Sequence, residues 1–132
     1  MAQSIPRMWR NQKQRYSLLG VKCENCNESF FPQRKICPNC RRKGNMSECK
    51  LPHTGKIFSF SLLYGSPEGF EYEVPYFIGL IELDNGVKIL AQIVDSNADK
   101  VKIGAKVKMM FRRVQAGTAS DAIAYGYKFK VV

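Results

Sequence analysis

Two pairs of cysteines form the most chemically distinctive pattern in this chain. Cys23 and Cys26 make one C-x-x-C pair, Cys37 and Cys40 make a second, and ten residues separate the pairs. A C-x-x-C turn directs two thiolates at one point, and two such turns supply the four soft donors that tetrahedral zinc takes at about 2.3 Å. The spacing therefore predicts a zinc ribbon whose zinc is structural, because four thiolates leave no open coordination position.

Two disulfides are the alternative use of these four cysteines, and the rest of the chain argues against it. The first residues, MAQSIPRMWRNQKQR, lack the apolar segment of a secretory signal, and the longest uncharged stretch, 57–67, is too short to span a bilayer. We therefore expect a cytoplasmic protein without a membrane segment, in which cysteines stay reduced and bind metal. Cys49, the fifth cysteine, is expected to be a half-buried spectator thiol.

The positive charge is concentrated in the N-terminal part of the 132 residues, whose formal net charge is +10. Residues 1–50 hold 11 Lys/Arg against 3 Asp/Glu, whereas residues 51–132 hold 10 against 8. Four thiolates on one zinc contribute about −2, so the loaded N-terminal region would carry about +6. A polyanion or an acidic protein surface fits this region as a partner, and a solvated basic face is the alternative.

Residues 1–20 are predicted to form a helical leader, with Ser4 as the N-cap and Gly20 as the end of the helix. A helix of about ten residues is marginal alone in water, so its apolar stripe must dock either on this chain or on a partner. Trp and Arg are favoured interface anchors. The candidate partner contacts in the leader are Met8, Trp9 and Arg10.

The predicted ribbon covers residues 21–50. Asn27 follows the first cysteine pair, where a knuckle commonly needs a positive φ, and Asn tolerates that conformation. Arg41 follows the second pair and lacks this tolerance, so the second knuckle is predicted to be less regular. The only histidine, His53, is not needed as a ligand.

From residue 51 to residue 132 the sequence is typical of short strands. We predict strands at 55–64, 76–83, 87–94, 105–114 and 122–132, with a loop at 115–121. An Asn-Gly turn joins the second strand to the third, and the connector 95–104 is expected to hold a helical turn. Five strands and one helical connector favour a closed barrel, most simply an OB-fold. The whole chain is then mainly β with an N-terminal helix.

Alternation within the strands predicts which side chains share a face. In the first strand the shared face is expected to hold Phe58, Phe60, Leu62 and Tyr64. In 105–114, Val107, Met109 and Phe111 are expected to face one way, and Lys106, Lys108 and Met110 the other. In the last strand the shared face holds Ile123, Tyr125, Tyr127, Phe129 and Val131.

The order of these motifs resembles a known family. A basic helix with Trp9–Arg10 leads to a ribbon ending in FFPQRKICPNC, and GKIFSFSLLY, VPYFIGLIEL, the KIGAKV turn and YGYKF follow in that order. The chain resembles the archaeal and bacterial proteins that join a rubredoxin-like zinc ribbon to an OB-fold, known as domain of unknown function 35. The resemblance covers almost the whole chain, although the family usually has Gly where Asn27 stands.

The resemblance implies a function in acyl-CoA metabolism. Members of the family are associated with thiolase-like enzymes, and a stand-alone archaeal member of this size resembles the component that bridges acetoacetyl-CoA thiolase and hydroxymethylglutaryl-CoA (HMG-CoA) synthase. It implies a non-catalytic scaffold in the mevalonate pathway of isoprenoid biosynthesis. Such a subunit helps bind coenzyme A and shelters acetoacetyl-CoA between two active sites.

Candidate ligand contacts follow from chemistry and not from the family. Coenzyme A offers phosphates for Lys or Arg and an adenine for stacking, and the residues near the end of the chain that suit it are Arg112, Arg113, Tyr125, Tyr127, Lys128 and Lys130. Tyr125 and Tyr127 fit equally a core position, because they belong to a one-face stripe. Phe70 and Tyr72, in the loop 65–75, are candidates to cover a ligand or a partner surface.

Three other functions compete with this hypothesis. A single-stranded nucleic-acid binder is the first alternative, because a basic chain with a ribbon and an OB-fold suits one, although the barrel region has only 10 Lys/Arg against 8 Asp/Glu. A rubredoxin-type iron carrier is the second, but that class is small and acidic. An enzyme acting alone is disfavoured, because the sequence shows no nucleophile–base pair with a consistent spacing and no open metal site.

Overall fold

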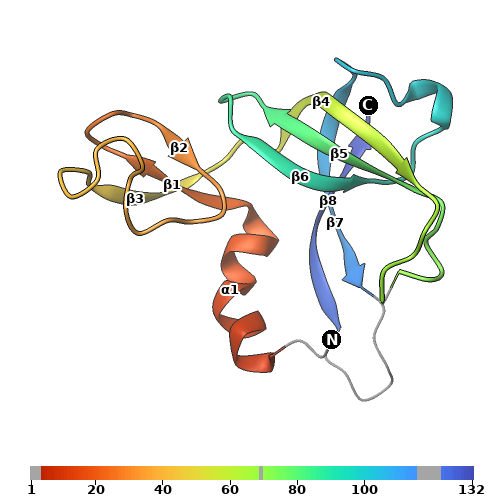
Figure 1. Cartoon of the computed structure of the whole chain (residues 1–132), viewed down its shortest axis with the longest axis horizontal. Helices are drawn as coiled ribbons and strands as arrows, with labels where there is room; N and C mark the ends of the chain where they lie inside the picture. Colours follow the sequence, from red (N-terminus) through yellow and green to blue (C-terminus); the bar gives the residue numbers. More distant parts are fainter. Residues whose placement is uncertain (1–3, 69, 116–122) are drawn as a thin grey trace.

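The chain folds into a small sheet and a closed barrel, with one helix lying beside both (Figure 1). The structure is a computed structural model and describes residues 4–68, 70–115 and 123–132. The predicted fold class, mainly β with an N-terminal helix, is confirmed. In chain order the elements are α1 (Ile5–Ser17), β1 (Leu19–Cys23), β2 (Ser29–Phe30), β3 (Met46–Lys50), β4 (Thr54–Leu63), β5 (Tyr76–Leu83), β6 (Lys88–Ile93), the 3-10 helix η1 (Ala98–Lys100), β7 (Lys106–Gln115) and β8 (Ala124–Val131).

The helix α1 begins after Ser4, as predicted, but ends at Ser17 and not at Gly20. Leu18 ends it in a left-handed conformation (φ 51°) and donates its N–H to the Gln14 carbonyl. Because the Leu18 side chain is fully buried, its packing offsets the cost of the positive φ. No helix among the described residues is long and apolar enough to cross a membrane.

Gly20, predicted to end the helix, lies instead within β1. A Cβ atom at this position would lie 2.5 Å from the Phe30 carbonyl oxygen of β2. Glycine therefore permits the close approach of two strands here. The small sheet has the antiparallel order β2-β1-β3, and the loop between β2 and β3 carries the second cysteine pair.

The five strands of the C-terminal part form the predicted closed barrel, in the order β4-β5-β6-β8-β7. Neighbouring strands are antiparallel except for β6 and β8, which are parallel. The Asn-Gly turn is confirmed by Gly86, which has φ 87° and donates its N–H to the Leu83 carbonyl at 2.8 Å. The barrel core holds Ile57, Ile81, Leu83, Val87, Ile89, Ala91, Ile93, Val101, Val107 and Phe129.

The predicted single face of β4 is wrong at Phe58, because a β-bulge interrupts the strand. Pairing with β5 shifts between Ile57 and Ser59, and the extra residue turns Phe58 outward. There the Lys88 ammonium lies 4.0 Å from the centroid of the Phe58 ring. Phe60, beyond the bulge, is also exposed and contacts the ring of Phe77.

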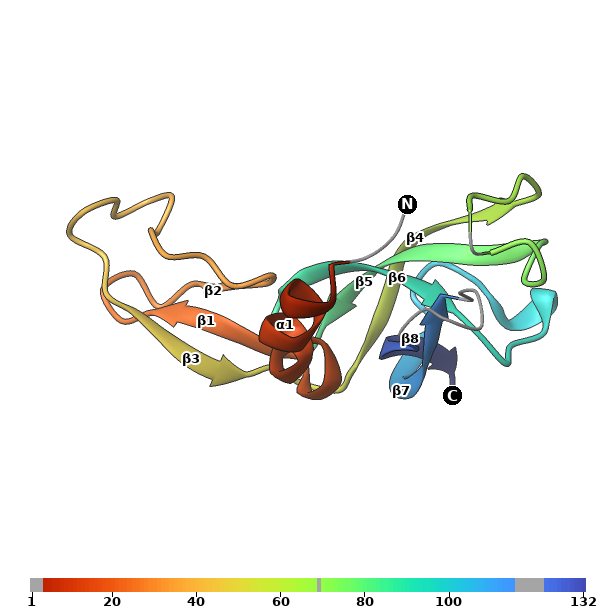
Figure 2. The same cartoon turned by 90° about the horizontal axis from the view of Figure 1, so that it is seen from below.

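The strands β7 and β8 extend past the barrel and run beside α1 (Figures 1 and 2). Tyr16 of α1 meets Phe111 of β7 with ring centroids 4.9 Å apart, and Phe111 stacks on Tyr125 of β8. The side chains on the predicted shared face of β8 therefore lie in two environments. Phe129 is fully buried in the barrel, whereas Tyr125 is exposed near the helix. The predicted loop 115–121 lies, apart from its first residue, outside the described residues.

Candidate metal centre and interdomain cavity

The four predicted cysteines come together at one end of the small sheet. Their sulfur atoms all lie within 4.8 Å of one another, and the Sγ atoms of Cys26 and Cys37 are 3.6 Å apart. Tetrahedral zinc with bonds of about 2.3 Å places its sulfur ligands about 3.8 Å apart. Cys23 and Cys37 are buried and the other two are half-buried, so the centre is closed by four protein ligands and fits a structural zinc.

Both cysteine knuckles have the same backbone geometry, so the prediction of a less regular second knuckle is wrong. Asn27 donates its N–H to the Cys23 carbonyl at 2.7 Å, and Arg41 donates its N–H to the Cys37 carbonyl at 2.8 Å. The two residues have φ values of 60° and 52°. A left-handed conformation costs an Arg roughly 1 kcal/mol, which one hydrogen bond and the shared metal are sufficient to offset.

The pKa values of the cysteines explain why this cluster needs a cation. A hydrogen bond from the Cys26 backbone lowers the pKa of Cys23 to about 6. At Cys26 the Glu28 backbone acts in the same direction, but burial and the neighbouring sulfurs outweigh it and raise the pKa to about 12. One thiolate forms readily and opposes the next, and a divalent ion removes this opposition.

Cys49 and His53 lie outside the sulfur cluster. Cys49 is half-buried and packs against the hydrophobic core, as expected of a spectator thiol. His53 is exposed, and its Nε2 lies 3.4 Å from the Ser17 carbonyl oxygen.

A cavity of about 710 Å³ lies where α1, the ribbon and the barrel meet. Small-molecule sites in proteins typically occupy about 300–1,000 Å³. Its floor includes Ile78 of β5 and Leu90 of β6, which are the second and third strands of the barrel. This is the face on which OB-folds commonly bind ligands. The cavity therefore has both the size and the position of a ligand site.

Basic and aromatic side chains line the cavity from all three parts of the chain. Arg7 and Arg15 come from α1, Phe31 from the ribbon loop, and Tyr125 and Tyr127 from β8. The rings of Phe31 and Tyr127 meet edge to face, 5.5 Å apart. Burial raises the pKa of Tyr127, an effect that the Arg15 charge partly opposes, so this phenol is a neutral hydrogen-bond donor at pH 7.

A buried ion pair ties the loop 65–75 to the barrel beside the cavity. Lys128 is only 4% exposed, and its Nζ lies 3.1 Å from Oε2 of Glu73. The same carboxylate oxygen accepts a hydrogen bond of 2.7 Å from Nε2 of Gln92. Lys128, predicted as a phosphate contact of coenzyme A, lines the cavity, but Glu73 already neutralises its charge.

The structure separates the other predicted ligand contacts from the cavity. Arg112 forms an ion pair with Asp95, and Arg113 and Lys130 are exposed outside the cavity lining. Of the two loop aromatics, Phe70 lines the cavity and stacks on Tyr76 with centroids 5.8 Å apart. Tyr72 is 94% exposed, and its predicted contact with a partner stays a prediction.

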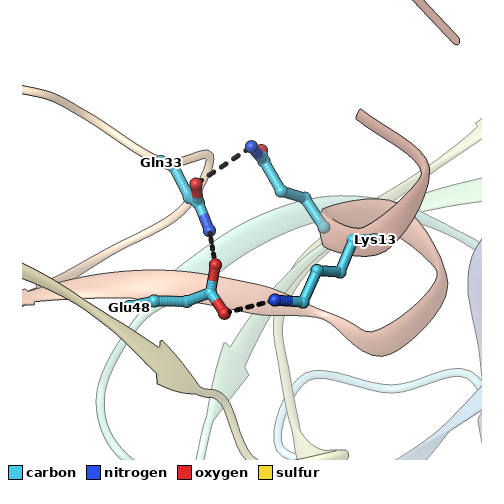
Figure 3. A network of polar contacts seen from close by, with 4 residues as sticks. Lys13, Gln33 and Glu48 are labelled. Atoms are coloured by element: carbon cyan, nitrogen blue, oxygen red, sulfur yellow. Dashed lines mark hydrogen bonds and ion pairs between the residues drawn. The ribbon is translucent and has the colours of Figure 1, made fainter. Parts of the chain in front are cut away.

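Docking of the leader on this chain is confirmed for the C-terminal half of α1. The C-terminal half docks on the ribbon, where Lys13 pairs with Glu48 at 2.9 Å and Gln33 links the same carboxylate to the helix (Figure 3). In the N-terminal half Trp9 is 75% exposed, Arg10 is exposed and Met8 is half-buried. This half presents an anchor that the described residues leave uncovered.

Sequence reasoning missed most of the cavity. Nothing in the sequence distinguishes Arg7 and Arg15 from the other basic residues of the leader, and only the fold brings them to the barrel. One signal was available in β6, whose sequence is KILAQI. Ile89, Ala91 and Ile93 form its buried face, and Leu90 adds an apolar side chain to the opposite face, a pattern typical of strands covered on both sides. Leu90 thus marked the outer face of β6 as a covered or binding surface.

The fold and the cysteine centre define a protein in which a zinc ribbon is followed by an OB-fold. The family model described as the ChsH2 rubredoxin-like zinc ribbon domain matches residues 10–47, and that of the ChsH2 C-terminal OB-fold domain matches residues 49–112. A DUF35 domain-containing scaffold protein of Methanocaldococcus jannaschii is 44% identical over 97% of this chain and 91% of its own length. Its counterpart in Methanothermobacter thermautotrophicus is 43% identical over 94% and 93%. This chain belongs to the DUF35 scaffold protein family.

Solved structures share the fold. The chain titled Ltp2-ChsH2(DUF35) aldolase has a TM-score of 0.71 at 20% identity, covering 99% of this chain and 96% of its own. A DUF35 protein of unknown function from Sulfolobus solfataricus has a TM-score of 0.55 at 25% identity, covering 96% and 84%. The arrangement of ribbon, helix and barrel is thus common to distant members.

Proposed function

We propose that this chain is a non-catalytic scaffold subunit of a complex of acetoacetyl-CoA thiolase and HMG-CoA synthase. In this role it helps bind coenzyme A and retain acetoacetyl-CoA. The observation that carries the proposal is the cavity of about 710 Å³ between α1, the ribbon and the barrel, in a chain whose relatives are scaffold proteins. Because thiolase condensation is uphill, direct transfer of its product to the next enzyme draws the reaction forward.

The lining suits the parts of coenzyme A. The apolar floor at Ile78 and Leu90 fits the pantetheine arm, and the exposed ring of Tyr125 offers a surface for the adenine. In this proposal Arg7 and Arg15 contact the phosphates, since they line the cavity, in place of Arg112, Arg113 and Lys130. The zinc holds the ribbon loop in position and takes no part in chemistry.

The exposed half of α1 is the proposed docking site for the thiolase-like enzyme. Ile5, Trp9 and Arg10 present an apolar and cationic surface typical of interface anchors. Support for an enzyme partner comes from the Ltp2-ChsH2(DUF35) aldolase. Support for acyl-CoA chemistry comes from a probable enoyl-CoA hydratase alpha subunit of Thermomonospora curvata, 25% identical over 75% of this chain and 30% of its own length.

The partners are tested by purifying the chain from nuclease-treated native lysate and identifying bound proteins by mass spectrometry. Thiolase and synthase subunits that survive the nuclease support the proposal. Ribosomal or replication proteins that disappear with the nuclease would favour the alternative, a single-stranded nucleic-acid binder.

The ligand is tested with Leu90→Glu, which places a carboxylate on the apolar floor of the cavity. We expect coenzyme A to bind the assembled complex about tenfold more weakly, measured by calorimetry. Phe58→Glu is the matched control, because it changes another exposed apolar residue of the same barrel outside the cavity lining. If Leu90→Glu and Phe58→Glu bind coenzyme A with the same affinity, the cavity is not the coenzyme A site.

A further inference from the structure

Four lysines form a cationic face on the barrel, at the end away from α1. Lys56 of β4 is the registered cross-strand neighbour of Lys106 of β7. Lys108, two residues further along β7, is the registered neighbour of Lys130 of β8. Residues directly opposite on antiparallel strands have Cβ atoms about 4.5–5.5 Å apart. All four side chains are exposed, and we call them the lysine face.

The acidic groups around the lysine face are engaged elsewhere or lie at its border. Asp95 pairs with Arg112, Glu73 pairs with Lys128, and Asp84 accepts a hydrogen bond from Thr54. Glu82 of β5 is the registered neighbour of Lys56 at the edge of the face. Within residues 4–68, 70–115 and 123–132, none of the four lysines forms an ion pair.

Like charges directly opposite one another destabilise a sheet. Glu82, opposite Lys56 on β5, relieves part of the repulsion in the first pair, whereas Lys108 and Lys130 have no acidic residue registered opposite them among the described residues. An external anionic surface would relieve the remaining repulsion. The four positions are thus suited to an acidic partner more than to free solvent.

The lysine face is separate from the helix and its docking surface. Side chains alternate along β7, and Phe111, which contacts Tyr16 of α1, has the opposite parity to Lys106 and Lys108. The alternation predicted for this strand is confirmed by the buried Val107 between the two exposed lysines. The C-terminal end of β8 lies at the opposite end of the barrel from α1 (Figure 1). A partner on this face therefore leaves α1 free.

The surroundings favour a protein partner over a nucleic acid. Single-stranded nucleic acid is held by basic residues interleaved with open aromatic rings. Phe58, two residues from Lys56 on β4, already has the ammonium of Lys88 4.0 Å from the centroid of its ring. Beside the face stands an aliphatic residue, Ile103, 72% exposed, whose neighbour Gly104 donates its N–H to Ile57 of β4. A cluster of exposed lysines is complementary in charge to an acidic protein surface.

We propose that the lysine face binds an acidic surface of a partner protein and is the second docking face of the scaffold. This inference rests on the proposed function, because a chain that bridges two enzymes needs two surfaces. The exposed half of α1 takes one enzyme, and the lysine face takes the other.

The test uses the full zinc-loaded chain with the thiolase and the synthase of its source organism, and measures binding of each enzyme by calorimetry. The double variant Lys108→Glu/Lys130→Glu is expected to bind one enzyme about 100-fold more weakly and the other unchanged. Lys43→Glu/Lys50→Glu is the matched control, with the same change of charge at exposed positions of the ribbon. We expect this control to bind both enzymes like the wild type.

Raising the salt concentration is a second readout, because a contact made by exposed charges weakens when the Debye length falls from about 10 Å at 0.1 M to about 3 Å at 1 M. If the Lys108→Glu/Lys130→Glu variant binds both enzymes with wild-type affinity, the lysine face is not a docking surface, and the proposed scaffold function is unaffected. A wild-type chain that binds neither enzyme would overturn the scaffold and this inference together. Loss by the same variant of binding to a single-stranded oligonucleotide, with enzyme binding unchanged, would assign the face to nucleic acid and overturn the inference.

Discussion

The ribbon and the barrel are each stabilised by a different kind of interaction. Between residues 21 and 50 the buried apolar side chains are Val21, Cys23 and Cys37, and two of these three belong to the sulfur cluster that could hold a metal ion. The barrel instead buries a continuous cluster of aliphatic side chains around Phe129. A unit with so little apolar burial needs a metal to fold, whereas the barrel has a hydrophobic core of its own.

The junction between the two units combines an extension of the barrel core with separate side-chain contacts. Leu18 and Leu51 belong to the same buried cluster as Phe129, and Phe31 and Cys49 of the ribbon pack against it. Tyr16 meets Phe111, Phe31 meets Tyr127, and Lys13 reaches Glu48. The cavity lies within this junction, so its shape depends on how the ribbon, the helix and the barrel are placed together. The metal centre, the barrel core and the junction can therefore each be tested by a substitution of its own.

The largest expected effect comes from removing a metal ligand. Cys37→Ser replaces a fully buried thiolate by a hydroxyl, which is a far weaker zinc ligand. Structural zinc contributes an apparent binding free energy of about 10–16 kcal/mol to folding, so we expect the ribbon to unfold and the barrel to stay folded. Zinc content by mass spectrometry and amide chemical shifts of the two units check this outcome.

Cys49→Ser is the matched control, because it removes a half-buried thiol that is not part of the sulfur cluster. This variant should retain one zinc per chain. If Cys37→Ser unfolds the barrel as well, the two units are not independently stabilised, and the contrast between them is wrong.

The second-largest effect is expected from a substitution in the barrel core, which should destabilise the barrel and leave the ribbon folded. Phe129→Ala leaves a cavity at a fully buried position where no other element compensates, and we expect a loss of about 3–5 kcal/mol in the free energy of unfolding. Urea denaturation followed by Tyr fluorescence measures this loss, and zinc content is expected to stay at one per chain. Release of zinc at the barrel transition would show that the ribbon relies on the barrel for its fold.

The sequence predicted the elements of both units because their signals are local. Cysteine spacing located the metal centre, and the hairpin at Gly86 followed from one dipeptide. The bulge at Phe58 was missed, because a bulge adds a residue without changing the strand composition. The cavity was missed in large part, because Arg7 and Arg15 acquire their role only when α1 lies beside β8. Contacts between the ribbon, the helix and the barrel leave no periodic pattern in the sequence of any of them.

A smaller effect is expected at the junction. Tyr16→Ala removes the ring that meets Phe111 at 4.9 Å and leaves the metal and the barrel core untouched. Aromatic pairs contribute about 0.5–1.5 kcal/mol beyond the area that they bury. We expect faster hydrogen exchange in α1 with little change in the melting temperature. Unchanged exchange in α1 would mean that its polar contacts to the ribbon are sufficient to hold it.

The smallest effect concerns the exposed pair of Lys13 and Glu48. The hydrogen bond from Lys13 holds the pKa of Glu48 below its ordinary value of 4.5, and burial opposes this shift. Because the folded pKa is depressed, the pair stabilises the fold above pH 4.5, and its contribution is lost as the pH falls through the folded pKa.

Lys13→Met should raise the pKa of Glu48 toward 4.5, while Gln33 continues to lower it slightly. Carboxyl NMR titration of the variant and the wild type measures the difference. The melting temperature at pH 7 is expected to change little, since exposed ion pairs contribute little to stability. A large loss at pH 7 would mean that this one contact, and not the aromatic pairs, fixes the ribbon on the helix, and the junction would then depend on charge instead of ring packing.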